Sequence, residues 1–269
     1  ANIDVSGRGF RGGTVSLNPD GFCGVGSPDF YYPLNPGGGS WLSGGAQKGE
    51  GIGSLSQSKE AGKGRLVNGG GGGNKHNAGG GGGSNYTDGG RGGFEYASCI
   101  STNNGIGGLA LSSSYTNNLV FAGGGGGCGD FNNAVGSAGE NGGGIVIITT
   151  ASVTGNNFII NASGFSVTTV AGSTGDGAGG GGGGGAIFLN AGTIVSPATL
   201  IANGGSGGDQ NASACVGPGG GGGTGVILSS LPSMAGLTYS LLPGPAGAFI
   251  NGACPGINYG ALAGTTNTV

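Results

Sequence analysis

Positive charge is missing from most of this chain. All eight Lys and Arg residues lie between Arg8 and Arg91, and none occurs from Gly92 to Val269. This distribution disfavours nucleic-acid binding, because neutralising phosphates requires clustered cations. Trypsin-like proteases have no cleavage site across the same stretch, which suits a protein outside the cell, although simple compositional drift explains the pattern equally well.

Histidine, long apolar runs and closely spaced cysteines are also scarce. The chain has one histidine and no Cys-x-x-Cys motif, so we expect no metal site and no cofactor. No apolar run approaches the roughly 18 residues that a membrane-spanning helix requires. No sequence pattern brings together a nucleophile, a base and an orienting acid, so we expect no enzymatic activity.

The cysteines are few and widely spaced along the chain. Such spacing favours up to two disulfides and one odd thiol in an oxidising compartment, whereas buried packing in a reduced protein would leave the same pattern. We therefore predict an extracellular or cell-surface location. The disulfide candidates are Cys23, Cys99, Cys128, Cys215 and Cys254.

Glycine, in contrast, supplies 76 of the 269 residues. The glycines form unbroken runs, which excludes the strict Gly-X-Y period of collagen. Ordering a glycine costs more backbone entropy than ordering any other residue. A run such as 179–185 can adopt the polyproline II conformation, and runs without side chains can pack with their backbone N–H and C=O groups bonded to neighbouring runs. Flexible linkers between strands are the alternative interpretation.

Apolar segments follow the glycine runs at a regular spacing. Segment 145–149 aligns with 186–190 at an offset of 41, and a third copy begins at Val226, about 40 residues later. A degenerate fourth copy begins at Leu109. Each copy is typical of a glycine run, a short β-branched strand, a turn and a second strand, and none has the i, i+3, i+4 apolar spacing of a helix.

These patterns predict an all-β fold class. Short β-strand repeats with a period of about 40 residues would combine with a bundle of packed polyglycine II helices and almost no α-helix. A propeller has a similar period, but each of its blades needs about four strands. We expect residues 1–95 to form a glycine-rich N-terminal part with two polyglycine runs, and residues 96–269 to form the repeats and to pack with the first part as one unit.

Three stretches of the N-terminal part carry a family resemblance: Gly7–Gly13, Gln47–Ile52 and Asn68–Gly83. With these stretches, residues 1 to 95 resemble the glycine-rich surface modules of large secreted adhesins in Bacteroidetes-type bacteria. The chain is more loosely similar to the glycine-rich domain of anaplastic lymphoma kinase and to polyglycine tail-fibre adhesins of some phages. The resemblance implies an extracellular structural or adhesive role and supplies no catalytic residues.

One aromatic-rich loop is a candidate ligand-binding site. Exposed aromatic rings can stack on the apolar faces of sugars or anchor a protein partner, although packing in a core is their commoner role. The candidates are Tyr31, Tyr32 and Trp41.

A second candidate lies between the five-glycine runs 69–73 and 79–83. There, Asn74, His76 and Asn77 can offer donors and acceptors to a sugar or a partner loop. We favour a turn that joins two antiparallel polyglycine helices, because asparagine tolerates left-handed backbone geometry and hydrogen-bonds its own turn.

Together, these features predict a non-catalytic structural or adhesive module of an extracellular surface protein or fibre. One alternative is the tip of an adhesin that binds a glycan or a receptor. Another is a self-assembling filament subunit, because low charge and unpaired strand edges favour pairing between copies. The expected partners are surface glycans or other copies of the chain.

Overall fold

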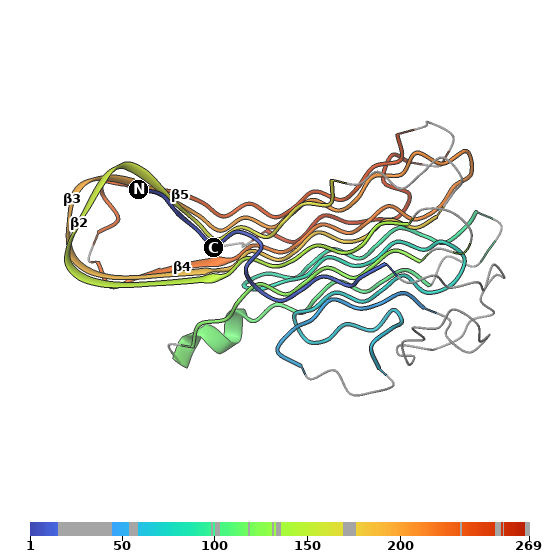
Figure 1. The fold of residues 1–269 in the computed structure, drawn as a ribbon, viewed down its shortest axis with the longest axis horizontal. Helices are drawn as coiled ribbons and strands as arrows, with labels where there is room; N and C mark the ends of the chain where they lie inside the picture. Colours follow the sequence, from blue (N-terminus) through green and yellow to red (C-terminus); the bar gives the residue numbers. More distant parts are fainter. Residues whose placement is uncertain are drawn as a thin grey trace.

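The computed structural model is elongated, with extended segments lying side by side along its long axis (Figure 1). Strands β2 and β3 turn at one end of the molecule. The structure describes residues 1–15, 45–53, 59–97, 99, 103–117, 119–130, 132, 136–168, 176–231, 233–250, 254 and 256–266. Within these ranges no helix combines the length and the apolar character needed to cross a bilayer.

In the part of the chain that the structure describes, five strands form one sheet in which every pairing is parallel. The strand order is β1-β2-β3-β4, and β5 also pairs with β3. A short 3₁₀ helix, η1, lies outside the sheet (Figure 1). The elements are β1 (Ile3–Asp4), η1 (Ser112–Asn117), β2 (Ile145–Asn161), β3 (Ala186–Ile201), β4 (Val226–Ser229) and β5 (Leu237–Ser240).

The two long strands bend so that each contributes to two layers. β3 pairs with β4 along Ala186–Leu189 on its outgoing half and with β5 along Ala198–Ile201 on its returning half. Figure 1 shows β2 and β3 running out along one side, turning together and coming back along the other. One sheet therefore encloses a core between its own two halves.

The core fills the space between the two halves of the bent strands. Val146 on the outgoing half of β2 belongs to the same buried cluster as Ile160 on its returning half. On β3 the corresponding pair is Ile187 and Leu200, both of which are completely buried. Burying one such side chain stabilises the fold by about 1.5–3 kcal/mol, so this cluster holds the bend closed.

The parallel register joins residues that lie about 40 positions apart in the sequence. Ile145 pairs with Ala186, and Ala186 pairs in turn with Val226. These pairs have the same offsets that align the apolar segments in the sequence. Each passage of the chain through the sheet therefore lies beside the passage before it.

Glycine-rich segments continue the strands and pack through backbone hydrogen bonds. N–H groups three residues apart bond to one neighbouring segment, whereas the two groups between them bond to two other segments. A threefold pattern without bonds inside the run is the geometry of polyproline II. The run 80–83 donates, in order, to the carbonyls of Ala178, Gly71, Gly90 and Gly181.

At the glycine positions, this packing has no room for a side chain. A Cβ atom added to Gly81 would lie 2.5 Å from the carbonyl oxygen of Ile106, which is closer than real Cβ contacts. We call these interbonded segments the glycine frame. Its segments are 69–73, 79–83, 89–93, 105–108, 123–129, 139–144, 179–185, 204–208, 217–225 and 244–247.

The predicted fold class, all-β with short-strand repeats, is wrong. Among the described residues the structure has one parallel sheet of five strands, with about 23% strand and 2% helix. The residues between 150 and 157 were expected to end one strand and separate it from the next. Instead β2 continues through them, because Asn156 and Asn157 adopt left-handed φ values of 46° and 62° and so turn the chain within the strand. Pairing with β3 resumes at Phe158 after a register shift.

The proposed boundary near residue 95 stays a prediction. Segments from both sides of it bond to each other within the glycine frame, as the N–H of Gly80 does to Ala178 and the N–H of Gly220 does to Gly80.

Candidate functional site

The aromatic loop predicted from the sequence lies outside the described residues. This applies to Tyr31, Tyr32 and Trp41, and also to Cys23 among the disulfide candidates. Their proposed roles stay predictions.

The predicted Asn-His-Asn block lies in a tight reversal between two glycine segments. Lys75, His76 and Asn77 have left-handed φ values of 62°, 39° and 67°. The Asn74 side chain is completely buried and that of Asn77 is 5% exposed, so neither is accessible to a ligand in solvent. The backbone N–H of Asn77 donates to the Asp130 carboxylate at 3.0 Å, which anchors the turn.

The single histidine is partly buried against the same turn. Its ring stacks on that of Tyr96, with centroids 4.7 Å apart, and its Nδ1 lies 3.1 Å from the sulfur of Cys99. This position fixes the ring as part of a packed loop. Of Asn74, His76 and Asn77, only His76 keeps intermediate exposure. Its neighbour Lys75 is exposed to a similar degree.

The described cysteines take two roles. Cys215 and Cys254 form a disulfide, and Cys99 is also disulfide-bonded. Cys128 keeps a buried, reduced thiol inside the glycine frame. Three of the five candidate cysteines therefore take part in disulfides.

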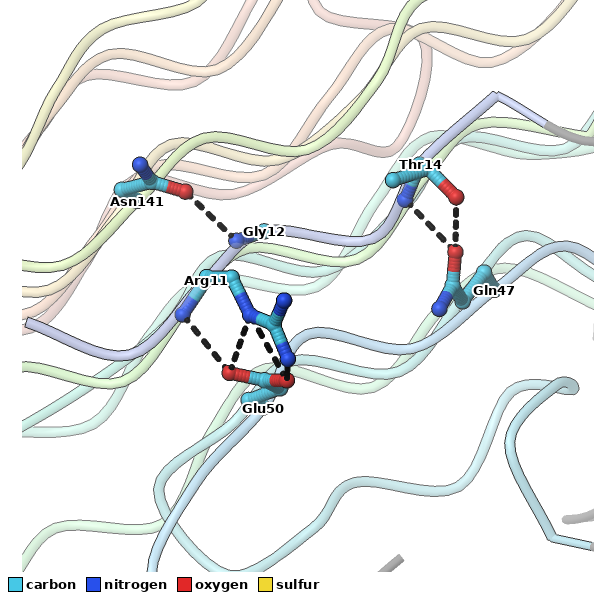
Figure 2. Close-up of polar contacts among 6 residues, drawn as sticks. All are labelled: Arg11, Gly12, Thr14, Gln47, Glu50 and Asn141. Carbon is cyan, nitrogen blue, oxygen red and sulfur yellow. Dashed lines mark hydrogen bonds and ion pairs between the residues drawn. The ribbon is translucent and has the colours of Figure 1, made fainter.

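A polar groove was not predicted from the sequence. It encloses about 380 Å³ along the surface of the glycine frame, where three extended segments meet. Figure 2 shows the polar contacts that shape it. We call it the Arg11 groove; its lining residues are Arg11, Gly12, Gly13, Thr14, Gln47, Glu50, Ala138, Gly139, Glu140 and Asn141.

The Arg11 guanidinium pairs with the Glu50 carboxylate on one side of this groove. Nε donates to Oε1 at 3.0 Å and Nη2 donates to the same oxygen at 2.5 Å. The hydrogen bonds from Arg11 hold the pKa of the Glu50 carboxyl below its usual range, and Glu50 raises the pKa of Arg11. The pair is exposed on the arginine side, so it contributes little to stability and mainly fixes both side chains in place.

Amide side chains bond the outward-facing N–H groups of the central segment. Asn141 Oδ1 accepts from the N–H of Gly12 at 2.9 Å, and Gln47 Oε1 accepts from the N–H of Thr14 at 2.8 Å (Figure 2). The same arrangement recurs elsewhere on the surface, where Asp209 accepts from the N–H of Ala248. An outer glycine segment lacks a neighbour on one side, and a side-chain oxygen replaces the missing carbonyl.

Glu140 is the carboxylate of the groove without a cationic partner among the described residues. It has intermediate burial, and this burial raises the pKa of its carboxyl, while the backbone N–H of Asn141 lowers it. Because Arg11 is engaged by Glu50, one uncompensated acid remains in the groove. The site therefore presents a carboxylate, a guanidinium and two amides over a floor of glycine.

A second hollow, of about 300 Å³, lies inside the bend of β2. Its lining is mostly apolar and includes Ile148, Phe158 and Ile160. The hydroxyl of Thr150 in this lining already donates to the carbonyl of Ser152. The Arg11 groove, in contrast, offers several polar groups that can orient a ligand, and we treat it as the candidate functional site.

Lys48 lies beside the groove on the same segment as Gln47, and its side chain is 4% exposed. Burial lowers its pKa to about 8, Lys59 lowers it further and Glu60 opposes the shift. The unfolded chain therefore binds more protons than the folded chain between pH 8 and pH 10.5, so the free energy of unfolding should rise over this range, by roughly 3 kcal/mol at most.

Replacing Lys48 by methionine removes the cost of burying the charge. We expect Lys48→Met to be more stable than the parent at pH 7 and to match it near pH 10.5. Urea unfolding of both proteins at pH 7, 9 and 10.5 measures this difference, and other groups that titrate affect both proteins alike. A constant difference across the three pH values would contradict the assignment.

The sequence carries little signal for this groove. Arg11 and Glu50 are 39 positions apart, and Glu140 is remote from both. Each lies in a glycine-rich stretch, so no periodic pattern of side chains indicates which segments become neighbours. The clustering of acids and amides next to glycines was the available clue.

No protein-family model, no curated protein and no solved structure matches this chain.

Proposed function

We propose that this chain is a non-catalytic structural module of an extracellular surface protein or fibre, which holds adhesive surfaces in a rigid frame. The observation that supports the proposal is the glycine frame. Its segments are joined by backbone hydrogen bonds in several directions, and their close approach leaves no space for a side chain at the glycine positions. Such a framework resists local opening, because each segment is bonded to more than one neighbour.

The polar side chains of the surface support the same proposal. Asn141, Gln47 and Asp209 use their oxygens to bond backbone N–H groups of outer segments. Side chains that complete a framework in this way are restrained by it, which favours a structural role for them over a catalytic one. Disulfides at Cys99 and Cys215 are compatible with an oxidising compartment.

Resistance to a protease of broad specificity tests the structural role. We expect proteinase K to digest the native chain at least tenfold more slowly than the same chain reduced and unfolded in urea. The backbone in the frame must open before it can enter a protease active site. Gel electrophoresis and mass spectrometry over time would identify the surviving fragments, which should contain residues 123–129 and 179–185. Digestion of the native chain at the unfolded rate would contradict the proposal.

A further inference from the structure

We propose that the Arg11 groove binds an amino sugar, with the ligand ammonium on Glu140 and its hydroxyls on Gln47 and Asn141. The inference deepens the proposed adhesive function and rests on it, because it names the class of surface glycan that the module would hold. It follows from the size, floor, donors and charge of the groove.

The size fits a short carbohydrate. The groove encloses about 380 Å³. A cavity of about 150 Å³ holds one six-membered ring such as benzene. The groove therefore has room for roughly two pyranose rings, and its volume lies near the lower end of the range for small-molecule sites.

The floor of the groove carries no side chains. Gly12, Gly13 and Gly139 line it, and the N–H of Gly139 bonds to the carbonyl of Gly13. A sugar ring can therefore approach the backbone itself. The side chains that rise around this floor are polar, apart from the methyl of Ala138, so the groove offers no apolar pocket for the methylene groups of a peptide side chain.

Hydrogen-bond donors surround the floor. The oxygens of Gln47 and Asn141 accept backbone N–H groups, which directs the amide nitrogens away from those bonds (Figure 2). Arg11 uses Nε and Nη2 on Glu50, and Nη1 makes no bond with the described residues. These nitrogens are pre-positioned by the frame and suit the hydroxyl oxygens of a sugar.

The charged side chains of the groove lining determine which class of sugar binds most favourably. Arg11 and Glu50 neutralise each other, and Glu140 is the remaining charged group of the lining. An acidic sugar would place a second anion beside Glu140, which is unfavourable in a partly buried site. A protonated amine would instead form a charge-assisted hydrogen bond with this carboxylate. The groove therefore favours glucosamine-type ligands over neutral and acidic ones.

Calorimetric titration with four oligosaccharides tests the inference: glucosamine tetramer, its fully N-acetylated form, a glucose tetramer and a galacturonic acid tetramer. We expect the glucosamine tetramer to bind at least tenfold more tightly than each of the others at pH 6, because only it carries ammonium groups. Equal affinity for the acetylated and free amines would overturn the assignment, and so would preferential binding of a lysine tetrapeptide.

A pair of matched variants locates the contact. Glu140→Gln should weaken binding of the glucosamine tetramer at least tenfold. Asp4→Asn removes one exposed carboxylate outside the groove and should leave the affinity unchanged. NMR spectra of the parent should show perturbed amide signals for Gly12 and Gly139 on titration. Unchanged affinity of Glu140→Gln, or perturbations confined to other regions, would reject the site.

This result can be separated from the structural role. If the native chain resists proteinase K but binds none of the four oligosaccharides, the amino-sugar site is wrong while the structural module stands. If the native chain is digested at once, the structural role itself fails.

Discussion

Gly81→Ala is expected to lower the free energy of unfolding by roughly 3–5 kcal/mol, and in a marginally stable chain it would prevent folding. The new Cβ would lie 2.5 Å from the carbonyl oxygen of Ile106 and 2.6 Å from its carbonyl carbon. Both atoms belong to backbone, so no side-chain rotation relieves the overlap.

The neighbours of Gly81 cannot move apart freely. Its N–H donates to Gly71 and its carbonyl accepts from Gly127, each at 2.8 Å. Shifting the segment away from Ile106 would stretch bonds to both of these neighbours, and each net hydrogen bond is worth about 1 kcal/mol. Strain at this position therefore spreads through the glycine frame.

Gly53→Ala is the matched control for this prediction. Its Cβ would meet the Val67 side chain at 3.1 Å, and a methyl group there can adjust. We expect the stability to remain within about 1 kcal/mol of the parent, since replacing glycine also reduces the entropy of the unfolded chain. Urea unfolding followed by circular dichroism measures both variants. Equal effects at the two positions would contradict the steric role of the glycine frame.

Much of the sheet could be located from the sequence, because its strands carry apolar side chains whose pattern indicates burial. Segment 145–149 was expected to be a strand that a turn separates from a second strand, and β2 includes this segment. The continuity of the two strands could not be predicted, since asparagine and glycine at a bend resemble the end of a strand. Pairing with β3 on both sides of the bend keeps β2 continuous, and this pairing is a tertiary interaction.

The neighbours within the glycine frame could not be predicted for a different reason. A glycine run has no side chain that distinguishes one neighbour from another, so rare polar residues set the arrangement. Asn85 is an example: its Nδ2 donates to the carbonyls of Phe121 and Gly184, and its Oδ1 accepts from the hydroxyl of Tyr115 at 2.5 Å. Burial raises the pKa of Tyr115 to about 12, so this hydroxyl stays a donor at neutral pH.

The same limit applies to the Arg11 groove. Arg11, Glu50 and Glu140 meet because their segments are adjacent in the frame, and that adjacency is determined by backbone hydrogen bonds. The sequence therefore shows which charged residues the chain has, but it does not show that these three come together in one groove.

Removing the Cys215–Cys254 disulfide is the second change expected to have a large effect. The bond closes a loop with a sequence separation of 39 residues. A cross-link of this length lowers the entropy of the unfolded chain by an amount worth about 4 kcal/mol in stability. The double variant Cys215→Ser/Cys254→Ser should lose stability of this order in urea unfolding under non-reducing conditions.

Cys128→Ser provides the control, because it also replaces a cysteine by a smaller hydroxyl residue. The thiol of Cys128 lies 3.1 Å from the carbonyl of Gly129 and 3.3 Å from that of Ser137, and a serine hydroxyl can donate to either. We expect this variant to lose no more than about 1 kcal/mol. Equal losses in the two proteins would mean that the cross-link adds nothing to cysteine replacement.

The location of the disulfide makes its effect separable from that of the glycine frame. Cys254 packs against the buried cluster of Ala212, Val216 and Phe249, which lies beyond the glycine segments that end near Gly217 and Gly247. The double variant should therefore keep slow amide exchange at Gly81 and Gly127 at low urea concentration while its exchange near Phe249 accelerates. Loss of protection at Gly81 in this variant would show instead that the loops and the frame unfold as one cooperative unit.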